Sequence, residues 1–152
     1  MAPLSSSPSP GISIPALKPP RLAFTEAPDC LVGLSRIHGE GLFARRNFRS
    51  GEVVCNYAAS FEKWRLCLYK DIPDSYMAQC WFVGVSETEC RLGDPESVFM
   101  RCNHSRDANC LWLPLEHTLV ANRYIPAGTE ITDDYRLDIA PPAFKAAPPP
   151  WA

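Results

Sequence analysis

The sequence lacks an excess of either charge. Its 15 Lys and Arg residues stand against 17 Asp and Glu residues, which gives a formal net charge of -2 and a pI of about 5.9. A protein without a basic field has little to attract the phosphates of nucleic acid or an anionic membrane surface. We therefore expect no direct nucleic acid partner.

Long hydrophobic runs are also missing. No stretch approaches the roughly 18 to 20 apolar residues that a membrane-spanning helix needs, and the first residues lack the apolar centre of a secretory signal. We expect no membrane partner and an intracellular protein, nuclear or cytoplasmic, that is not secreted. A transit peptide is the alternative, because serines are frequent and no acid precedes Glu26. The prolines of this segment favour an ordinary disordered arm.

Paired cysteines of the zinc-knuckle type are absent, although the chain has seven cysteines. No C-x-x-C spacing occurs, and an odd number argues against a closed set of disulfides. Buried free thiols in a reducing compartment are the simpler interpretation. We expect no metal site. The cysteines are Cys30, Cys55, Cys67, Cys80, Cys90, Cys102 and Cys110.

Proline is scarce in the middle of the chain and frequent at both ends. Of the 16 prolines, seven lie in residues 1–28 and five in residues 141–150. Proline removes a backbone donor and restricts the preceding residue, so such segments favour extended, poorly ordered chain. The pattern predicts a disordered Pro/Ser-rich tail over 1–30, one folded domain over 31–136, and a Pro-rich tail over 137–152.

Short apolar runs separated by Gly, Pro, Asn or Asp fill the middle of the chain, which is typical of strands. One helix is expected over 60–70, because Phe61, Trp64 and Leu68 recur at helical spacing and Ser60 stands where it could cap the first turn. The sequence predicts a mostly β fold of small sheets with little helix. The expected strands are 31–34, 42–44, 53–57, 77–83, 98–100, 110–113 and 118–122.

The first segment whose residues could bind a ligand is Gly39-Glu40-Gly41. Glycines allow positive φ and a close approach of backbone N–H groups to a ligand. A tight turn between two strands is the competing interpretation. The third glycine and the following helix of a dinucleotide site are missing.

The second segment is Asn103-His104-Ser105, followed by Asn109. An amide beside an imidazole can donate and accept hydrogen bonds to a polar ligand. A structural turn is an alternative, because Asn and Ser bind their own backbone. The triplet also fits the N-glycosylation pattern, but a chain without a secretory signal does not meet that machinery.

The third segment runs from Gly128 to Tyr135 and contains Glu130, Asp133 and Asp134. A tyrosine at the end of a strand is often a half-buried packing residue. The three acids could instead attract a lysine-rich peptide electrostatically.

The order of the three segments resembles the SET domain family of protein-lysine methyltransferases. Its members have a glycine loop followed by Leu-Phe-Ala, then Asn-His-Ser, then a Gly-Glu-Glu-x-x-x-Asp-Tyr element. Here these elements are Gly39–Ala44, Asn103–Ser105 and Gly128–Tyr135. The resemblance covers residues 31–136. It implies a β-clip architecture of small sheets with a C-terminal pseudoknot that joins the Asn-His and Tyr segments.

The resemblance also implies a function. The expected reaction is transfer of a methyl group from S-adenosyl-L-methionine to a lysine of a protein or peptide, with a histone tail as a candidate. Tyr135 is the expected catalytic residue. Tyr57 and Tyr76 are candidates for the substrate channel by position, with a place in the hydrophobic core as the equal alternative for each. The residues implied in cofactor binding are Gly39, Glu40, Gly41, Asn103, His104 and Tyr135.

Some positions depart from the family pattern. No cysteine follows Cys110, and Arg106 follows Ser105, so we expect no zinc-binding post-SET region. The aromatic residues of the tail, Phe144 and Trp151, are then expected to close the site. Ala108, Thr129 and Met100 stand where the family usually has Pro, Glu and Arg.

Two alternative functions stay open: a SET fold with little or no catalysis, and an unrelated small β domain that carries the three motifs by chance. A SET fold can serve as a binding or scaffolding module with little or no catalysis. Some compact members of the family pair as dimers, so a homodimer is a further option.

Overall fold

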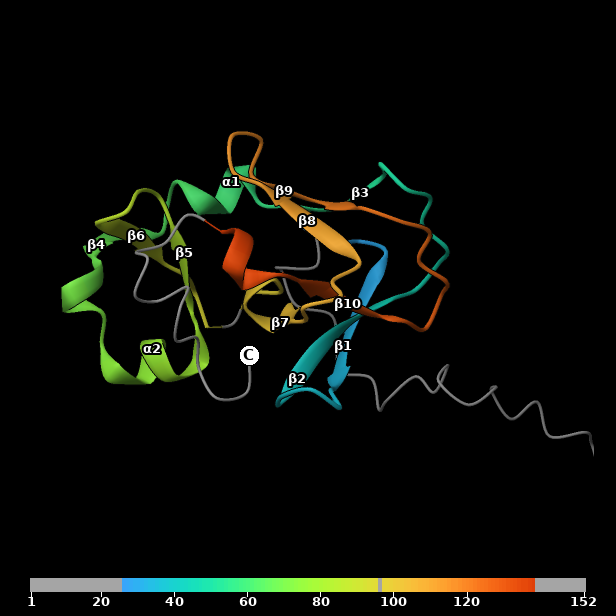
Figure 1. The fold of residues 1–152 in the computed structure, drawn as a ribbon, viewed down its shortest axis with the longest axis horizontal. Coiled ribbons are helices and arrows are strands. Elements are labelled where there is room, and N and C mark those ends of the chain that lie inside the picture. The colour runs from blue at the N-terminus through green and yellow to red at the C-terminus, as the bar shows by residue number, and fades with distance from the viewer. Residues whose placement is uncertain (1–25, 96, 139–152) are drawn as a thin grey trace, which may run out of the picture.

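The computed structural model describes residues 26–95 and 97–138, which form three small sheets joined by short helical turns (Figure 1). The predicted tails lie mainly outside these residues, as do Phe144 and Trp151. Ala27 is fully buried and the first strand begins at Cys30. Chain packing therefore starts within the segment that the sequence assigns to the N-terminal tail.

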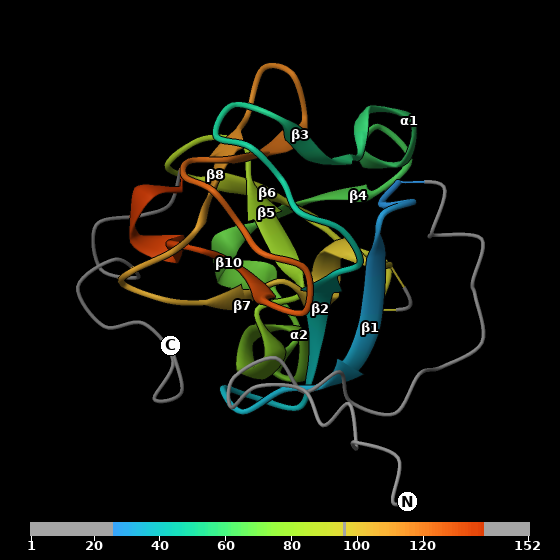
Figure 2. The same cartoon turned by 90° about the vertical axis from the view of Figure 1, so that its right-hand side faces the viewer.

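The first sheet has the strand order β1-β2-β10-β7. Its members are β1 (Cys30–Leu34), β2 (Glu40–Ala44), β10 (Glu130–Asp133) and β7 (Asn103–His104). β10 pairs antiparallel with β2 on one side and parallel with β7 on the other, as Figure 2 shows. Parallel pairing needs a long connection. This pairing brings together three segments that are far apart in the sequence.

The second sheet is antiparallel, with the order β3-β9-β8. Its strands are β3 (Val53–Asn56), β9 (Thr118–Ala121) and β8 (Cys110–Leu113). In β8, Cys110 and Trp112 are buried and Leu111 is exposed, as the two-residue period of a strand requires. The inward side chains of the first two sheets share one hydrophobic core, which includes Leu42, Leu119 and Ile131.

The third sheet belongs to residues 65–95, which we call the insert. β4 (Arg65–Leu68), β6 (Glu89–Leu92) and β5 (Phe82–Gly84) pair antiparallel, and the short helices η2 (Tyr69–Asp71) and α2 (Asp74–Gln79) connect β4 to β5. The insert lies to one side of the first sheet (Figure 1). It has a small hydrophobic cluster of its own, built from Cys67, Ile72, Cys90 and Leu92.

The helix expected over 60–70 is wrong. Only α1 (Ala58–Phe61) and the start of η2 (Tyr69–Asp71) are helical there, and residues 65–68 are strand β4. Phe61 and Trp64 are buried, whereas Leu68 is exposed. Residues 65–68 pair with β6, more than 20 positions later, and such long-range pairing overrides a local helical period. The hydroxyl of Ser60 donates to the carboxylate of Glu26 instead of capping a helix.

Two of the expected strands are also corrected. Residues 74–79 form α2 after Pro73, so the strand expected over 77–83 begins only at Phe82. The strand expected over 98–100 is the 3-10 helix η3 (Phe99–Arg101). The other five expected strands are present with small shifts at their ends. The last element is the 3-10 helix η4 (Tyr135–Leu137), and no helix among the described residues is long and apolar enough to cross a membrane.

Candidate active site

A pocket of about 140 Å³ opens where the β1–β2 turn, η3, β7, the start of η4 and the end of α2 in the insert meet. The three segments singled out in the sequence all contribute to it, together with two residues of the insert. Its walls therefore come from five separate parts of the chain. The lining residues are His38, Gly39, Glu40, Gln79, Trp81, Met100, Arg101, Asn103 and Tyr135.

The two glycines of the first segment have different structural roles. Gly39 has φ of +49°, a left-handed conformation that favours glycine in the turn between β1 and β2. A Cβ on Gly41 would lie 2.3 Å from Oε1 of Glu130 and 3.0 Å from Cβ of Ser35. Gly41 thus leaves space for a carboxylate of β10.

The side chain of Asn103 connects the β1–β2 turn to β7 and β10 by hydrogen bonds. Its side-chain Nδ2 lies 2.9 Å from the carbonyl oxygen of His38 and 3.1 Å from that of Glu40. The same nitrogen lies 3.0 Å from both Oγ of Ser35 and Oε1 of Glu130. An amide nitrogen has two protons, so four acceptors share two donors. The side chain of Asn103 therefore fixes the shape of the pocket rim.

Glu40 and Arg101 form an ion pair at the pocket. Nε of Arg101 lies 3.1 Å from Oε1 of Glu40, and the two side chains are 11% and 21% exposed, respectively. A partly buried pair of this kind is screened less by water than a surface pair. Arg101 was not among the candidates from the sequence, although it stands two positions before Asn103.

Two hydrogen bonds connect Tyr135 to residues 102–104. Its hydroxyl donates to the carbonyl oxygen of Cys102 at 2.5 Å, and its backbone N–H donates to Nδ1 of His104 at 3.1 Å. Burial raises the pKa of Tyr135 well above its usual value, and the neighbouring Cys102 thiol adds to the effect. The hydroxyl is therefore protonated at neutral pH.

His104 supports Tyr135 and does not line the described pocket. Since Nδ1 accepts the Tyr135 amide, the neutral ring has its proton on Nε2, which has no hydrogen-bond partner among the described residues. Burial lowers the pKa of the His104 imidazole, while Asp134 at 3.8 Å acts in the opposite direction. A neutral imidazole is the expected state at pH 7.

The acids of the third segment do not form an exposed negative surface. Asp133 and Asp134 are only 3% and 5% exposed. Asp134 binds Arg136, with Oδ2 and Nη2 2.5 Å apart, and burial raises the pKa of Asp133 to about 6. Glu130 accepts hydrogen bonds from Ser35 and Asn103. The expectation that these acids attract a peptide is not supported by their placement.

The two channel candidates lie in different places. Tyr57 is fully buried in the main core, with its ring centroid 6.1 Å from that of Trp112. Tyr76 is a half-buried residue of α2, and its ring packs edge-on against Trp81 at 5.7 Å. Neither is among the residues that line the described pocket, whereas Trp81 is.

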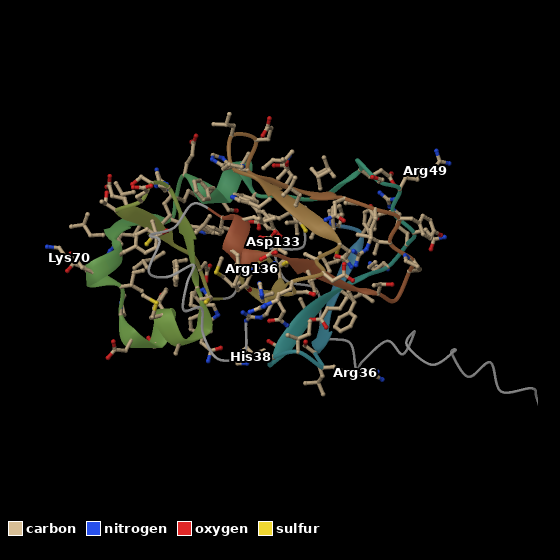
Figure 3. All side chains as sticks on the ribbon, in the orientation of Figure 1. Arg36, His38, Arg49, Lys70, Asp133 and Arg136 are labelled. Atoms are coloured by element: carbon tan, nitrogen blue, oxygen red, sulfur yellow. The ribbon has the colours of Figure 1, made fainter. Side chains whose placement is uncertain are left out.

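The insert reaches the pocket through a contact that the sequence does not reveal. Nε2 of His38 lies 2.9 Å from Oε1 of Gln79, which joins the β1–β2 turn to the end of α2. Figure 3 shows His38 at the end of the hairpin, toward α2. His38, Gln79 and Trp81 carry no local motif, so only the tertiary structure identifies them.

Three small sheets, a parallel β7–β10 pair and a pocket built on the glycine turn define a SET-type β fold. The family model described as SET domain matches residues 39–136, which is more than half of the chain. The chain therefore belongs to the SET domain family. The predicted family and fold class are confirmed.

SET domains are in general protein-lysine methyltransferases that use S-adenosyl-L-methionine. Residues 26–95 and 97–138 contain no group of three or more His, Cys, Asp or Glu side chains arranged to hold a metal ion. All seven cysteines are free thiols. The lack of a zinc-binding post-SET region stays a prediction.

Proposed function

We propose that this protein transfers a methyl group from S-adenosyl-L-methionine to a lysine side chain of a protein. The observation that carries the proposal is the Glu40–Arg101 ion pair, which lies in one pocket with Asn103 and Tyr135. The proposal extends to Gly39, Glu40, Gly41, Asn103 and His104 as the residues that bind or shape the cofactor site, with Tyr135 at the reacting groups.

The charges of the pocket fit the amino-acid end of this cofactor. Its α-carboxylate suits the guanidinium of Arg101, which can form a forked pair of hydrogen bonds, and its α-ammonium suits the carboxylate of Glu40. Without a ligand the two side chains neutralise each other at 3.1 Å. They can exchange that contact for the two ends of a zwitterion without leaving a buried charge unpaired.

The pocket is small for a whole cofactor. Sites for ligands of this size usually measure roughly 300 to 1,000 Å³, against about 140 Å³ here. The contacts that close the rim are the Glu40–Arg101 pair and the His38–Gln79 hydrogen bond. Binding of the whole cofactor therefore requires the pocket to widen around these two contacts.

When bound, the cofactor supplies an electrophilic methyl group on a positively charged sulfur. The lysine amine must be neutral to accept it, and releasing its proton to bulk water at pH 7 costs about 4.6 kcal/mol relative to a pKa of about 10.4. Tyr135 cannot take that proton, because its hydroxyl is protonated and donates to Cys102. Its role is to orient the amine, and orientation of this kind supplies up to roughly 7 to 11 kcal/mol.

The substrate we propose is a lysine within a protein, and core histones are the first candidates. The test incubates the full chain with methyl-labelled S-adenosyl-L-methionine and either core histones or total cell protein, followed by mass spectrometry of the labelled residue. Calorimetry measures cofactor binding separately. Binding without transfer to any protein would favour the scaffolding alternative, and the absence of both would refute the proposal.

The ion pair has its own test. Arg101→Met and Glu40→Gln should each weaken cofactor binding at least about 10-fold, because each leaves one charge of the zwitterion unpaired. Arg123→Met is the matched control, since Arg123 forms an exposed pair with Asp107 and does not line the pocket. Unchanged affinity in both pocket variants would remove the observation on which the proposal rests.

A further inference from the structure

Trp81 is a pocket residue held in place by its own backbone and by a neighbouring ring. It follows Cys80, which ends α2 in a left-handed conformation with φ of +54°. The N–H of Trp81 donates to the carbonyl of Tyr76 at 3.0 Å, and its carbonyl accepts from the N–H of Gly93 at 3.0 Å. The rings of Trp81 and Tyr76 pack at 89°. The indole is therefore fixed before any ligand binds.

Trp81 and Met100 make up an apolar wall of the pocket. A Cβ on Gly93 would lie 2.6 Å from both Sδ and Cε of Met100, so the methionine packs directly on Gly93. Gly93 is in turn hydrogen-bonded to Trp81. The charged residues Glu40 and Arg101 share the same small pocket with this wall.

The described lining residues offer no second carboxylate that could pair with the positively charged sulfur of the cofactor. Among the described lining residues Glu40 is the one carboxylate, and the proposed function assigns it to the α-ammonium. Only two methylene groups separate the α-carbon of the cofactor from its sulfonium. With its amino-acid end on Glu40 and Arg101, the cofactor would have its sulfonium in the same small pocket, where Trp81 and Met100 are the apolar lining residues. A tryptophan face is the best aromatic partner for a cation.

We propose that Trp81 recognises the positive charge of the sulfonium and so makes the site prefer the methylated cofactor over the neutral thioether that remains after transfer. The inference rests on the proposed function and adds the residue that sets this preference. It also gives the insert a direct part in the cofactor site. Release of the spent cofactor follows from the same contact, because the thioether has no charge for the indole to attract.

The test is calorimetry with S-adenosyl-L-methionine and S-adenosylhomocysteine, which differ in the methyl group and its charge. The variants are Trp81→Leu, which keeps an apolar side chain, and Trp81→Phe, which keeps an aromatic face. Trp81→Leu should lose about 5- to 30-fold in affinity for the sulfonium compound and less than about 2-fold for the thioether. Trp81→Phe should restore most of the difference.

Sinefungin, which has a protonated amine in place of the sulfonium, should follow the sulfonium compound. Far-ultraviolet circular dichroism and thermal unfolding check that each variant is folded. Equal losses for the charged and neutral ligands, or no loss in Trp81→Leu, would overturn the role of Trp81 and leave the proposed function intact. If the unchanged protein bound none of the three, the proposed function itself would fail, and this inference with it.

Discussion

The side-chain amide of Asn103 donates to the carbonyl oxygen of His38 across 2.9 Å, although 65 residues separate the two. Through this contact β7 holds the turn that carries Gly39 and Glu40. The neighbouring acceptors, Ser35 and Glu130, complete the cluster. A residue expected to bind the cofactor thus also holds in place the turn that carries two other expected cofactor residues.

Replacing Asn103 should therefore affect folding and binding together. Asn103→Ala leaves the carbonyls and the Glu130 carboxylate with fewer donors, and such a loss costs about 1–3 kcal/mol of unfolding free energy. Urea unfolding measures the loss of stability, and calorimetry should show weaker cofactor binding. Asn122→Ala is a control with one amide bond to the backbone, at Ala108. A variant as stable as the unchanged protein would contradict this role.

Glu130 lies so close to Gly41 that substitutions at the two positions should have coupled effects on stability. Gly41→Ala places a methyl group where Oε1 of Glu130 lies, and this oxygen is held by Ser35 and Asn103. The single variant should lose about 1–3 kcal/mol of unfolding free energy, a typical cost for overpacking. In the double variant Gly41→Ala, Glu130→Ala the losses should be less than additive.

Gly39→Ala is the comparison for Gly41→Ala. Its Cβ would meet nothing within 4 Å, but its φ of +49° adds about 1 kcal/mol of backbone strain. Because Glu130 has no part in that strain, Gly39→Ala and Glu130→Ala should be additive. If the losses of unfolding free energy were additive in both pairs of variants, a side chain at position 41 would not clash with Glu130.

The sequence predicts the strands that carry the site better than it predicts the residues that line the pocket. The motif order and the alternation of strands such as β8 identify three sheet segments, and the parallel β7–β10 pair joins them. Arg101, by contrast, carries no pattern of its own. Its importance follows from its distance to Glu40, which depends on the pairing of strands far apart in the chain.

The insert was the hardest part to predict, for a related reason. Its strands are three or four residues long and its hydrophobic cluster is small, so packing against the rest of the chain decides its local structure. Residues 61–68 have a helical period, yet β4 forms because β6 pairs with it. Trp81 and Gln79 enter the pocket only as a result of that tertiary arrangement.

Because Asp133 is buried, the free energy of unfolding should depend on pH in an unusual way. Burial raises its pKa from 3.8 to about 6 in the folded protein, so the fold disfavours the charged form. Its contribution to stability is fully present below pH 3.8 and is lost as the pH rises through about 6. The difference between these two pKa values corresponds to about 3 kcal/mol of unfolding free energy over the whole titration.

Asp133→Asn should remove this loss. Urea unfolding between pH 4 and pH 7 should show the unchanged protein losing about 2 kcal/mol relative to the variant, because part of the loss already occurs below pH 4. Asp107→Asn is the control, because the side chain of Asp107 is 92% exposed. Parallel curves for the unchanged protein and Asp133→Asn would show that Asp133 does not titrate in this range.

Tyr135→Phe separates orientation from cofactor binding. The change removes the hydroxyl that donates to Cys102 and keeps the ring beside His104, 5.2 Å away between centroids. The methyl-transfer rate should fall about 100- to 1,000-fold, the usual effect of losing one oriented polar group at a reacting centre. Cofactor affinity should change less than about 3-fold, because the charged contacts at Glu40 and Arg101 remain.

The matched control is Tyr124→Phe, because Tyr124 is a described tyrosine that is 56% exposed and does not line the pocket. It should retain full activity. Single-turnover kinetics with labelled cofactor measure the transfer step, and calorimetry measures binding. Since Tyr135 is protonated and acts by orientation, Tyr135→Phe should lower the rate by the same factor from pH 7 to pH 9. A factor that grows with pH would instead mean that the hydroxyl ionises to act as a base.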